Sequence, residues 1–201
     1  MSEILETLFG SKARTRILRF FLLNSEKEYR VMEIAKKNML PSGATRKELN
    51  ELIKIKFLTK HTRKGVKYYA LDQTFHFYFE LKNLFAKSTS SPQCKNLTKL
   101  KNIGDVKLAL VSGIFLNYPK SKVDMVIVAN NVSRGKLKSV MNGLEAEVGK
   151  EVSFVLMNSD EFKYRLDMLD RFLIDFIEGT HMELIDKIPG FKRFLLGRKK
   201  Y

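Results

Sequence analysis

Apolar positions in the first part of the chain recur three or four residues apart, which is the spacing of one face of an α-helix. This repeat is clearest in the segment KARTRILRFFLLN, at Ile17, Leu18, Phe21 and Leu22. Ser11 precedes the segment and is of a residue type that caps helix N-termini, so we expect a helix from Ser11 to about Asn24. A short extended segment, EYRV, and a second helix around MEIAKKNM follow it.

A third helix and a hairpin are expected next. The segment LPSGATRKELNELIKIKFL has an apolar stripe made of Leu49, Leu52 and Ile53. Ser42 can cap this helix, with Pro41 just outside it. Two β-rich runs in FLTKHTRKGVKYYALD are then joined by TRKG, where Gly65 permits a tight reversal. Helix, short strand, helix, helix and hairpin is the element order of a winged-helix fold.

The polar face of the third helix carries positive charge. At about 100° per residue, Lys47, Asn50 and Lys54 lie away from Leu49 and the apolar stripe. In a DNA major groove, such a helix would place Lys47 and Asn50 at base edges and Lys54 at phosphate, with the basic hairpin on adjacent backbone or minor groove. The predicted DNA-binding residues are Thr45, Arg46, Lys47, Asn50, Lys54, Arg63, Lys64 and Lys67. The alternatives are that these side chains only solvate the surface, or that the fold binds protein.

The charge distribution favours a polyanionic partner. The formal net charge is +15 and the pI is about 9.8, as is typical of proteins that bind nucleic acid. Residues 36–67 hold ten Lys and Arg against two Glu, a net charge of +8, so over half of the excess is local. The C-terminal FKRFLLGRKKY adds five more cations, as a solvated tail or as an auxiliary contact to the DNA backbone.

Several other function classes are disfavoured. A hydrophobic content of 44% predicts a packed core, yet no apolar run approaches the roughly 20 residues that span a bilayer. The N-terminus lacks the order of a signal peptide. The single Cys94 and three scattered histidines make no familiar zinc site. We therefore expect a cytoplasmic protein with no metal, no cofactor and no membrane partner.

The second half of the chain has a different pattern of predicted elements. From residue 105, β-rich segments alternate with helical ones, which predicts an α/β domain. The small polar segment STSSPQCKN before it is typical of a linker. The expected fold class is α+β, with a winged helix-turn-helix domain over 1–87, a linker over 88–104 and a small α/β domain with C-terminal helices over 105–201.

Residues 8–72 resemble the winged-helix domains of small prokaryotic ArsR-like transcriptional regulators. The resemblance is carried by LFGSKARTRILRFFL, SGATRKELNEL and KYYALD. It implies that the helix with ATRKELNEL reads DNA, that the hairpin is the wing, and that the protein acts as a homodimer. The metal-sensing cysteines of some relatives have no counterpart here.

Residues 106–165 resemble the minimal nucleotidyltransferase domain. That family has a strand ending in Gly-Ser, a strand opening with Asp-x-Asp, and a third carboxylate on a later strand. Gly113 matches the glycine and Asp124 the second aspartate, but Ile114, Lys122 and Ser153 replace the serine, the first aspartate and the third carboxylate. Because three carboxylates hold the two divalent ions of the reaction, the resemblance implies a domain without catalysis.

The two resemblances together imply a transcriptional regulator that binds double-stranded DNA and whose second domain serves ligand sensing or assembly. Lys120 and Lys122 are candidate phosphate contacts for a nucleotide effector, and a protein effector is the other option. One alternative function is an active nucleotidyltransferase that uses the winged helix for recruitment. Another is an antitoxin-like protein-interaction module.

Overall fold

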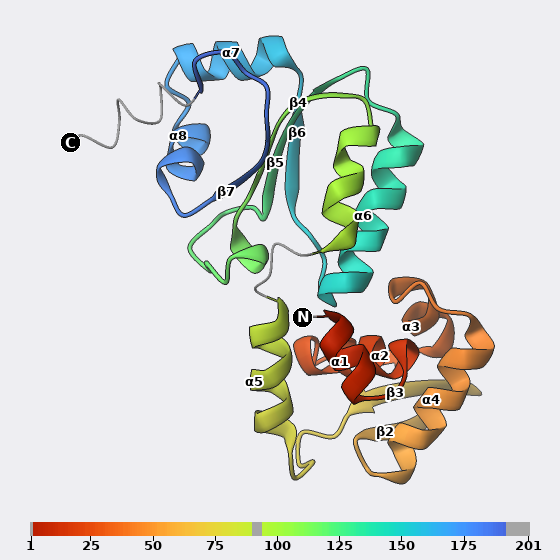
Figure 1. Cartoon of the computed structure of the whole chain (residues 1–201). Coiled ribbons are helices and arrows are strands. Elements are labelled where there is room, and N and C mark those ends of the chain that lie inside the picture. The colour runs from red at the N-terminus through yellow and green to blue at the C-terminus, as the bar shows by residue number, and fades with distance from the viewer. Residues whose placement is uncertain (1, 90–93, 192–201) are drawn as a thin grey trace. The chain divides into compact units, whose positions relative to one another are not determined.

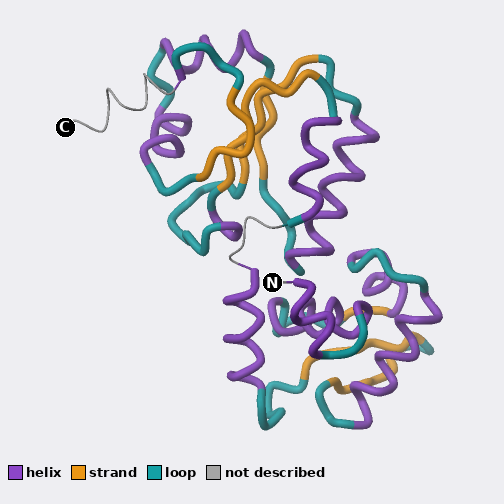
Figure 2. Tube along the Cα trace, viewed as in Figure 1, coloured by secondary structure: helices purple, strands orange, loops and turns teal. Residues whose placement is uncertain are grey.

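The computed structural model describes residues 2–89 and 94–191 and shows a mixed α+β protein with two sheets (Figures 1 and 2). The chain divides into two compact units. The first unit comprises Met1–Thr89 and Asn142–Glu151, and the second comprises Ser90–Met141 and Val152–Tyr201. Within the described residues, no helix combines the length and apolar character needed to cross a membrane.

The first unit has the element order predicted from the sequence, with one additional helix at the start and one at the end. Its helices are α1 (Ser2–Leu8), α2 (Lys12–Leu23), α3 (Val31–Lys37), α4 (Ser42–Lys54) and α5 (Tyr78–Thr89), and it also contains the part of α6 (Arg134–Val148) from Asn142 onward. Its strands are β1 (Tyr29–Arg30), β2 (Leu58–Arg63) and β3 (Val66–Leu71). The three strands form an antiparallel sheet in the order β1-β3-β2.

The predicted cap of α2 is confirmed, and the predicted cap of α4 is wrong. Ser11 is the N-cap of α2, and its side-chain oxygen accepts a hydrogen bond from the Arg14 backbone N–H. Ser42, in contrast, is the first residue inside α4, and Pro41 occupies the N-cap position without a side-chain hydrogen bond. The Ser42 hydroxyl instead lies 3.7 Å from the Met32 sulfur.

The core of the first unit is built from the faces that the apolar spacing predicts. Ile17, Phe21, Leu49 and Leu52 are all buried, and they share one cluster with Phe85 of α5. Aromatic residues around α5 divide between core and surface. Tyr78 and Phe85 are buried, whereas Phe77 and Phe79 are exposed.

The second unit contains a four-stranded mixed sheet in the order β6-β5-β4-β7. Its strands are β4 (Asp105–Val111), β5 (Met125–Asn130), β6 (Phe154–Met157) and β7 (Met182–Asp186). The β5–β6 pair is parallel and the other two pairs are antiparallel. Figure 1 shows α7 (Ser159–Asp167) and α8 (Arg171–Glu178) on one face of this sheet, with the part of α6 up to Met141 on the other.

Two features of the second unit were not predicted. Residues 95–102, within the expected linker 88–104, form the 3₁₀ helix η1 (Lys95–Asn102), which buries Leu97 and Leu100. Residues 90–93 of that linker and the basic tail 192–201 lie outside the described residues. The strand β7 was also missed, because its sequence MELID has only five residues and places two apolar residues, Leu184 and Ile185, side by side, which breaks the alternation that predicts a strand.

Candidate functional site

The outward face of α4 carries four of the predicted DNA-binding residues. Arg46, Lys47, Asn50 and Lys54 are all exposed, as their angular positions on the helix predict. Lys54 Nζ lies 2.8 Å from Glu51 Oε1, and this hydrogen bond is the main reason that the pKa of Glu51 is lowered. The charge of Lys54 is therefore partly balanced on its own helix.

The assignment of Thr45 to this face is wrong. Thr45 is fully buried, and its hydroxyl donates a 3.0 Å hydrogen bond to the Pro41 carbonyl oxygen. The reason is its spacing, because Thr45 precedes Leu49 by four residues and so shares the apolar face of the helix. Thr45 supports the start of α4 and is not available to a ligand.

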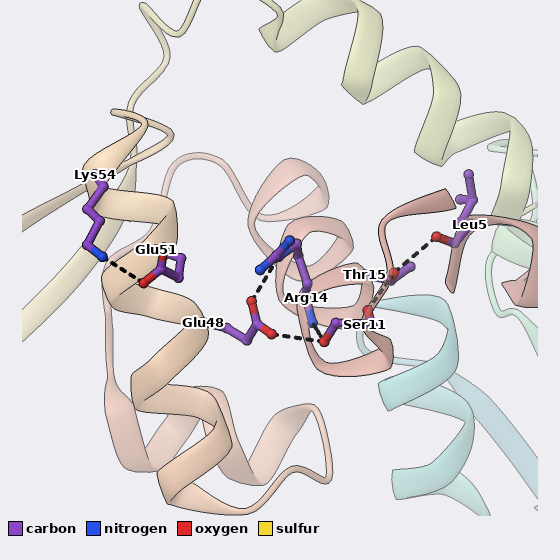
Figure 3. A network of polar contacts seen from close by, with 7 residues as sticks. All are labelled: Leu5, Ser11, Arg14, Thr15, Glu48, Glu51 and Lys54. Atoms are coloured by element: carbon purple, nitrogen blue, oxygen red, sulfur yellow. Dashed lines mark hydrogen bonds and ion pairs between the residues drawn. The ribbon is translucent and has the colours of Figure 1, made fainter. Parts of the chain in front are cut away.

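Glu48 fixes the opposite side of α4 to the start of α2. The Ser11 hydroxyl and Arg14 Nε donate hydrogen bonds of 2.9 Å to the two oxygens of the Glu48 carboxylate. Figure 3 shows the carboxylate pointing from α4 toward both donors, away from Lys54. Residue spacing alone did not identify Glu48, although an acidic residue within a strongly basic segment is a signal for a specific partner. The arrangement orients the exposed basic face of α4.

The hairpin between β2 and β3 presents the other predicted cations. Arg63, Lys64 and Lys67 are exposed, and Arg63 pairs with Val66 across the turn. The two turn residues, Lys64 and Gly65, both have positive φ angles, +49° and +77°. Positive φ at both central residues is the geometry of a type I′ turn, which matches the twist of the two strands.

Glu28 holds two side chains of the hairpin and was not identified from the sequence. One oxygen of its carboxylate contacts His61 Nε2, and the other accepts a hydrogen bond from Arg63 Nη1. The His61 ring also stacks on Tyr68, with an interplanar angle of 12°. Glu28 therefore limits the freedom of Arg63, whose side chain stays 67% exposed.

In the second unit, Gly113, Asp124 and Ser153 meet at one corner of the sheet. Asp124 Oδ1 accepts a 2.8 Å hydrogen bond from the Ile114 N–H, and Oδ2 accepts bonds of 2.9 and 2.7 Å from the Ser153 N–H and hydroxyl. A Cβ atom on Gly113 would lie 2.1 Å from Asp124 Oδ1, and Gly113 has φ +51°. The nearly buried Asp124 carboxylate thus joins three segments of the second unit. They are the segment that follows β4, the one that leads into β5 and the one that leads into β6.

This corner does not fit a pair of divalent ions. Three protein donors already occupy the Asp124 oxygens, and Lys122 Nζ pairs with Asp175 Oδ2 at 3.2 Å. Within residues 2–89 and 94–191, no group of three or more His, Cys, Asp or Glu side chains is placed to hold a metal ion. The hydrogen bonds to Asp124 therefore have a structural role, and we call Gly113, Asp124 and Ser153 the clamp.

A cleft of about 320 Å³ opens beside this corner, entirely within the second unit. Lys120 and Lys122, the two candidate phosphate contacts, both line it, together with Asp175 and Glu178 of α8. Ser112, which also lines the cleft, donates its backbone N–H to the Asp124 carbonyl oxygen at 2.8 Å. Tyr118, another lining residue, donates its backbone N–H to the Gly113 carbonyl oxygen at 2.8 Å, so the cleft and the clamp are direct neighbours.

No protein-family model, curated protein or solved structure matches this chain.

Proposed function

We propose that this chain is a transcriptional regulator that binds double-stranded DNA through a winged helix-turn-helix formed by its first unit. The observation that carries the proposal is the set of exposed cations on α4 and on the β2–β3 hairpin of the same unit, described above. In the proposed complex, α4 lies in the major groove with Lys47 and Asn50 at base edges. Lys54, Lys64 and Lys67 contact phosphates.

The packing of α4 supports this assignment. Leu49 and Leu52 are buried on one side of the helix, and Glu48 is hydrogen-bonded to Ser11 and Arg14 on the same half. A reading helix needs such a rigid attachment, because base contacts require side chains that are already positioned. The remaining half of α4 is polar, basic and exposed.

We propose that the regulator is a homodimer. Support comes from exposed apolar side chains on two helices of the first unit: Ile4 and Leu8 of α1 are 66% and 67% exposed, and Phe79 of α5 is 71% exposed. Exposed apolar side chains mark an association surface where they form a contiguous patch, so we propose that α1 and α5 together supply the dimer contact. Two copies related by a twofold axis would read half-sites about one helical turn, roughly 34 Å, apart.

For the second unit, we propose a nucleotidyltransferase-like domain that senses a ligand or supports assembly. Support comes from the positions of Gly113, Asp124 and Ser153, which lie where successive strands begin or end and meet at one corner. Of the three carboxylates that would hold two divalent ions, this corner has only Asp124. Ligand binding in the neighbouring cleft needs no such ions.

The decisive experiment measures the salt dependence of DNA binding. Fluorescence anisotropy with a mixed-sequence duplex compares the native chain with the variant Lys47→Ala/Lys54→Ala/Arg63→Ala. A control variant, Lys138→Ala/Lys163→Ala/Arg171→Ala, removes the same charge from exposed sites in α6, α7 and α8. Each phosphate contact releases counterions, so the first variant should flatten the slope of log affinity against log salt by up to about three units.

The control variant should keep the native slope to within about one unit, since non-specific charge loss alone changes few direct phosphate contacts. Equal slopes for the two variants would contradict the assignment of α4 and the hairpin as the DNA-binding surface. Feeble binding by all three proteins would contradict DNA binding itself.

A further inference from the structure

The cleft of the second unit has two walls, one formed by a loop and the other by a helix. One wall is the loop that leads into β5 and includes Tyr118, Lys120 and Lys122, and the other is α8 with Phe172 and Asp175. Its volume of about 320 Å³ is at the lower end of the range found for small-molecule sites, roughly 300–1,000 Å³. The cleft therefore suits a compact metabolite.

The charges that line the cleft are divided between the two walls. Lys120 and Lys122 extend from the loop, while Asp175 and Glu178 extend from α8. Two cations and two anions give a formal charge of zero. A nucleoside triphosphate brings about four negative charges and would meet the two carboxylates as well as the lysines, which disfavours it in this cleft.

An ion pair connects the two walls and is easily replaced. Lys122 Nζ lies 3.2 Å from Asp175 Oδ2, and the two side chains are 63% and 48% exposed. An ion pair this exposed contributes little to stability, because solvent screens both charges. A ligand with one positive and one negative group can replace this ion pair. Its negative group would contact Lys122, and its positive group would contact Asp175.

Aromatic rings supply the apolar part of the lining. Phe172 and Phe176 both face the cleft from α8, with ring centroids 6.5 Å apart, and Tyr118 faces it from the loop. Small-molecule sites combine apolar walls of this kind with a few polar groups that fix orientation. The rings provide a surface for an apolar or planar side chain.

We propose that this cleft binds a small zwitterion with the chemistry of a free α-amino acid. The ligand carboxylate contacts Lys120 and Lys122, its ammonium group contacts Asp175 and Glu178, and its side chain packs against Phe172. The inference specifies the ligand class of the sensing role proposed above and rests on that role. It does not depend on DNA binding by the first unit.

Isothermal titration calorimetry of the full chain with each of the common L-amino acids tests the proposal. At least one amino acid should bind with one site per chain. Its methyl ester, which lacks the carboxylate, and its N-acetyl derivative, which lacks the ammonium group, should each bind at least about tenfold more weakly. These two probes examine the two ends of the ligand separately.

Protein variants provide the matching test of the cleft. Lys122→Gln and Asp175→Asn should each weaken amino-acid binding by about tenfold or more, because each removes one charged contact. Lys163→Gln and Asp167→Asn, which change the same residue types at exposed positions of α7, should leave it unchanged.

Three results would overturn the inference: no binding of any amino acid at millimolar concentration, equal binding by cleft and control variants, or tighter binding of ATP than of every amino acid. Anisotropy with duplex DNA, measured on the same protein samples, reports separately on the proposed regulator function. A chain that binds DNA but no amino acid would contradict the ligand class alone.

Discussion

Arg14 and Glu48 form a hydrogen-bonded ion pair inside the first unit, although they are 34 residues apart in the chain. The Glu48 side chain is only 10% exposed and also accepts the Ser11 hydroxyl, so its carboxylate has exchanged water for two protein donors. This pair attaches α4 to α2 at the point where the core ends and the exposed basic face begins.

Replacing Glu48 should destabilise the first unit. Glu48→Ala leaves Ser11 and Arg14 without their shared acceptor, and removing one partner of a buried charged hydrogen bond costs about 1–3 kcal/mol. Urea denaturation measures the change. Glu51→Ala is the matched control, because its ion pair with Lys54 is exposed and screened by solvent, so its loss should change the stability far less. Equal losses in the two variants would show that Glu48 does not hold α4.

Acid should weaken the start of α3 through Glu33. The Arg30 side chain, and then the Arg30 backbone N–H, donate hydrogen bonds to Glu33 and hold its pKa below the ordinary value of 4.5. The folded chain thus binds this proton less readily than the unfolded chain does. The stabilisation is complete above pH 4.5 and is lost as the pH falls through the lower, folded-state pKa.

The variant Glu33→Gln isolates this contribution. Its urea midpoint should lie below that of the native chain at neutral pH, and the two midpoints should converge well below pH 4.5. Glu183→Gln, at an exposed position of β7, controls for the loss of a negative charge. A difference between native chain and Glu33→Gln that persists in acid would exclude the ionised carboxylate as its cause.

The Asp124 corner should not tolerate a side chain at residue 113. In Gly113→Ala, the new Cβ would approach Asp124 Oδ1 to 2.1 Å and occupy a backbone with φ +51°. We expect a loss of at least about 2–4 kcal/mol in the free energy of unfolding of the second unit. Gly135→Ala in α6 meets nothing within 4 Å and should stabilise by up to about 1 kcal/mol. A tolerated Gly113→Ala would mean that the Asp124 carboxylate is not fixed in place.

Removing the Glu28 carboxylate should strengthen the electrostatic part of the proposed DNA binding. Glu28→Gln releases Arg63 from its counter-charge, so the slope of log affinity against log salt should become steeper by about one unit. Glu26→Gln changes the same charge at an exposed position two residues away and is the control. If both variants change the slope equally, only the net charge matters and Glu28 has no specific effect on Arg63.

The local elements of the first unit could be predicted because their signals lie within a few residues of one another. Ser11 bonds to Arg14, and Gly65 permits the turn that begins at Lys64. The burial of Thr45 was also readable, since it lies one helical turn before Leu49. Its assignment to the DNA-binding face overlooked that spacing.

The polar partners that orient the candidate site could not be predicted in the same way. Glu28 bonds to Arg63 across 35 residues, and Glu48 bonds to Arg14 across 34. Acidic residues occur beside basic ones throughout this chain, so charge alone does not choose between partners that the fold brings together. The convergence of Asp124 and Ser153, 29 residues apart, likewise depends on the parallel pairing of β5 with β6.

At the tip of the β2–β3 hairpin, Lys64 contributes a surface charge but has a backbone conformation that lysine disfavours. Lys64 has a left-handed backbone at φ +49°, which disfavours a side chain such as lysine by about 1–2 kcal/mol relative to glycine. Asparagine tolerates this conformation better, and Asn-Gly is the preferred pair for such a turn. A protein engineer could therefore obtain a more stable hairpin with Lys64→Asn, but only by giving up an exposed cation in the turn that follows the last paired residues, Arg63 and Val66. If the first unit binds DNA as proposed, this substitution would raise thermostability and lower nucleic-acid affinity at the same residue.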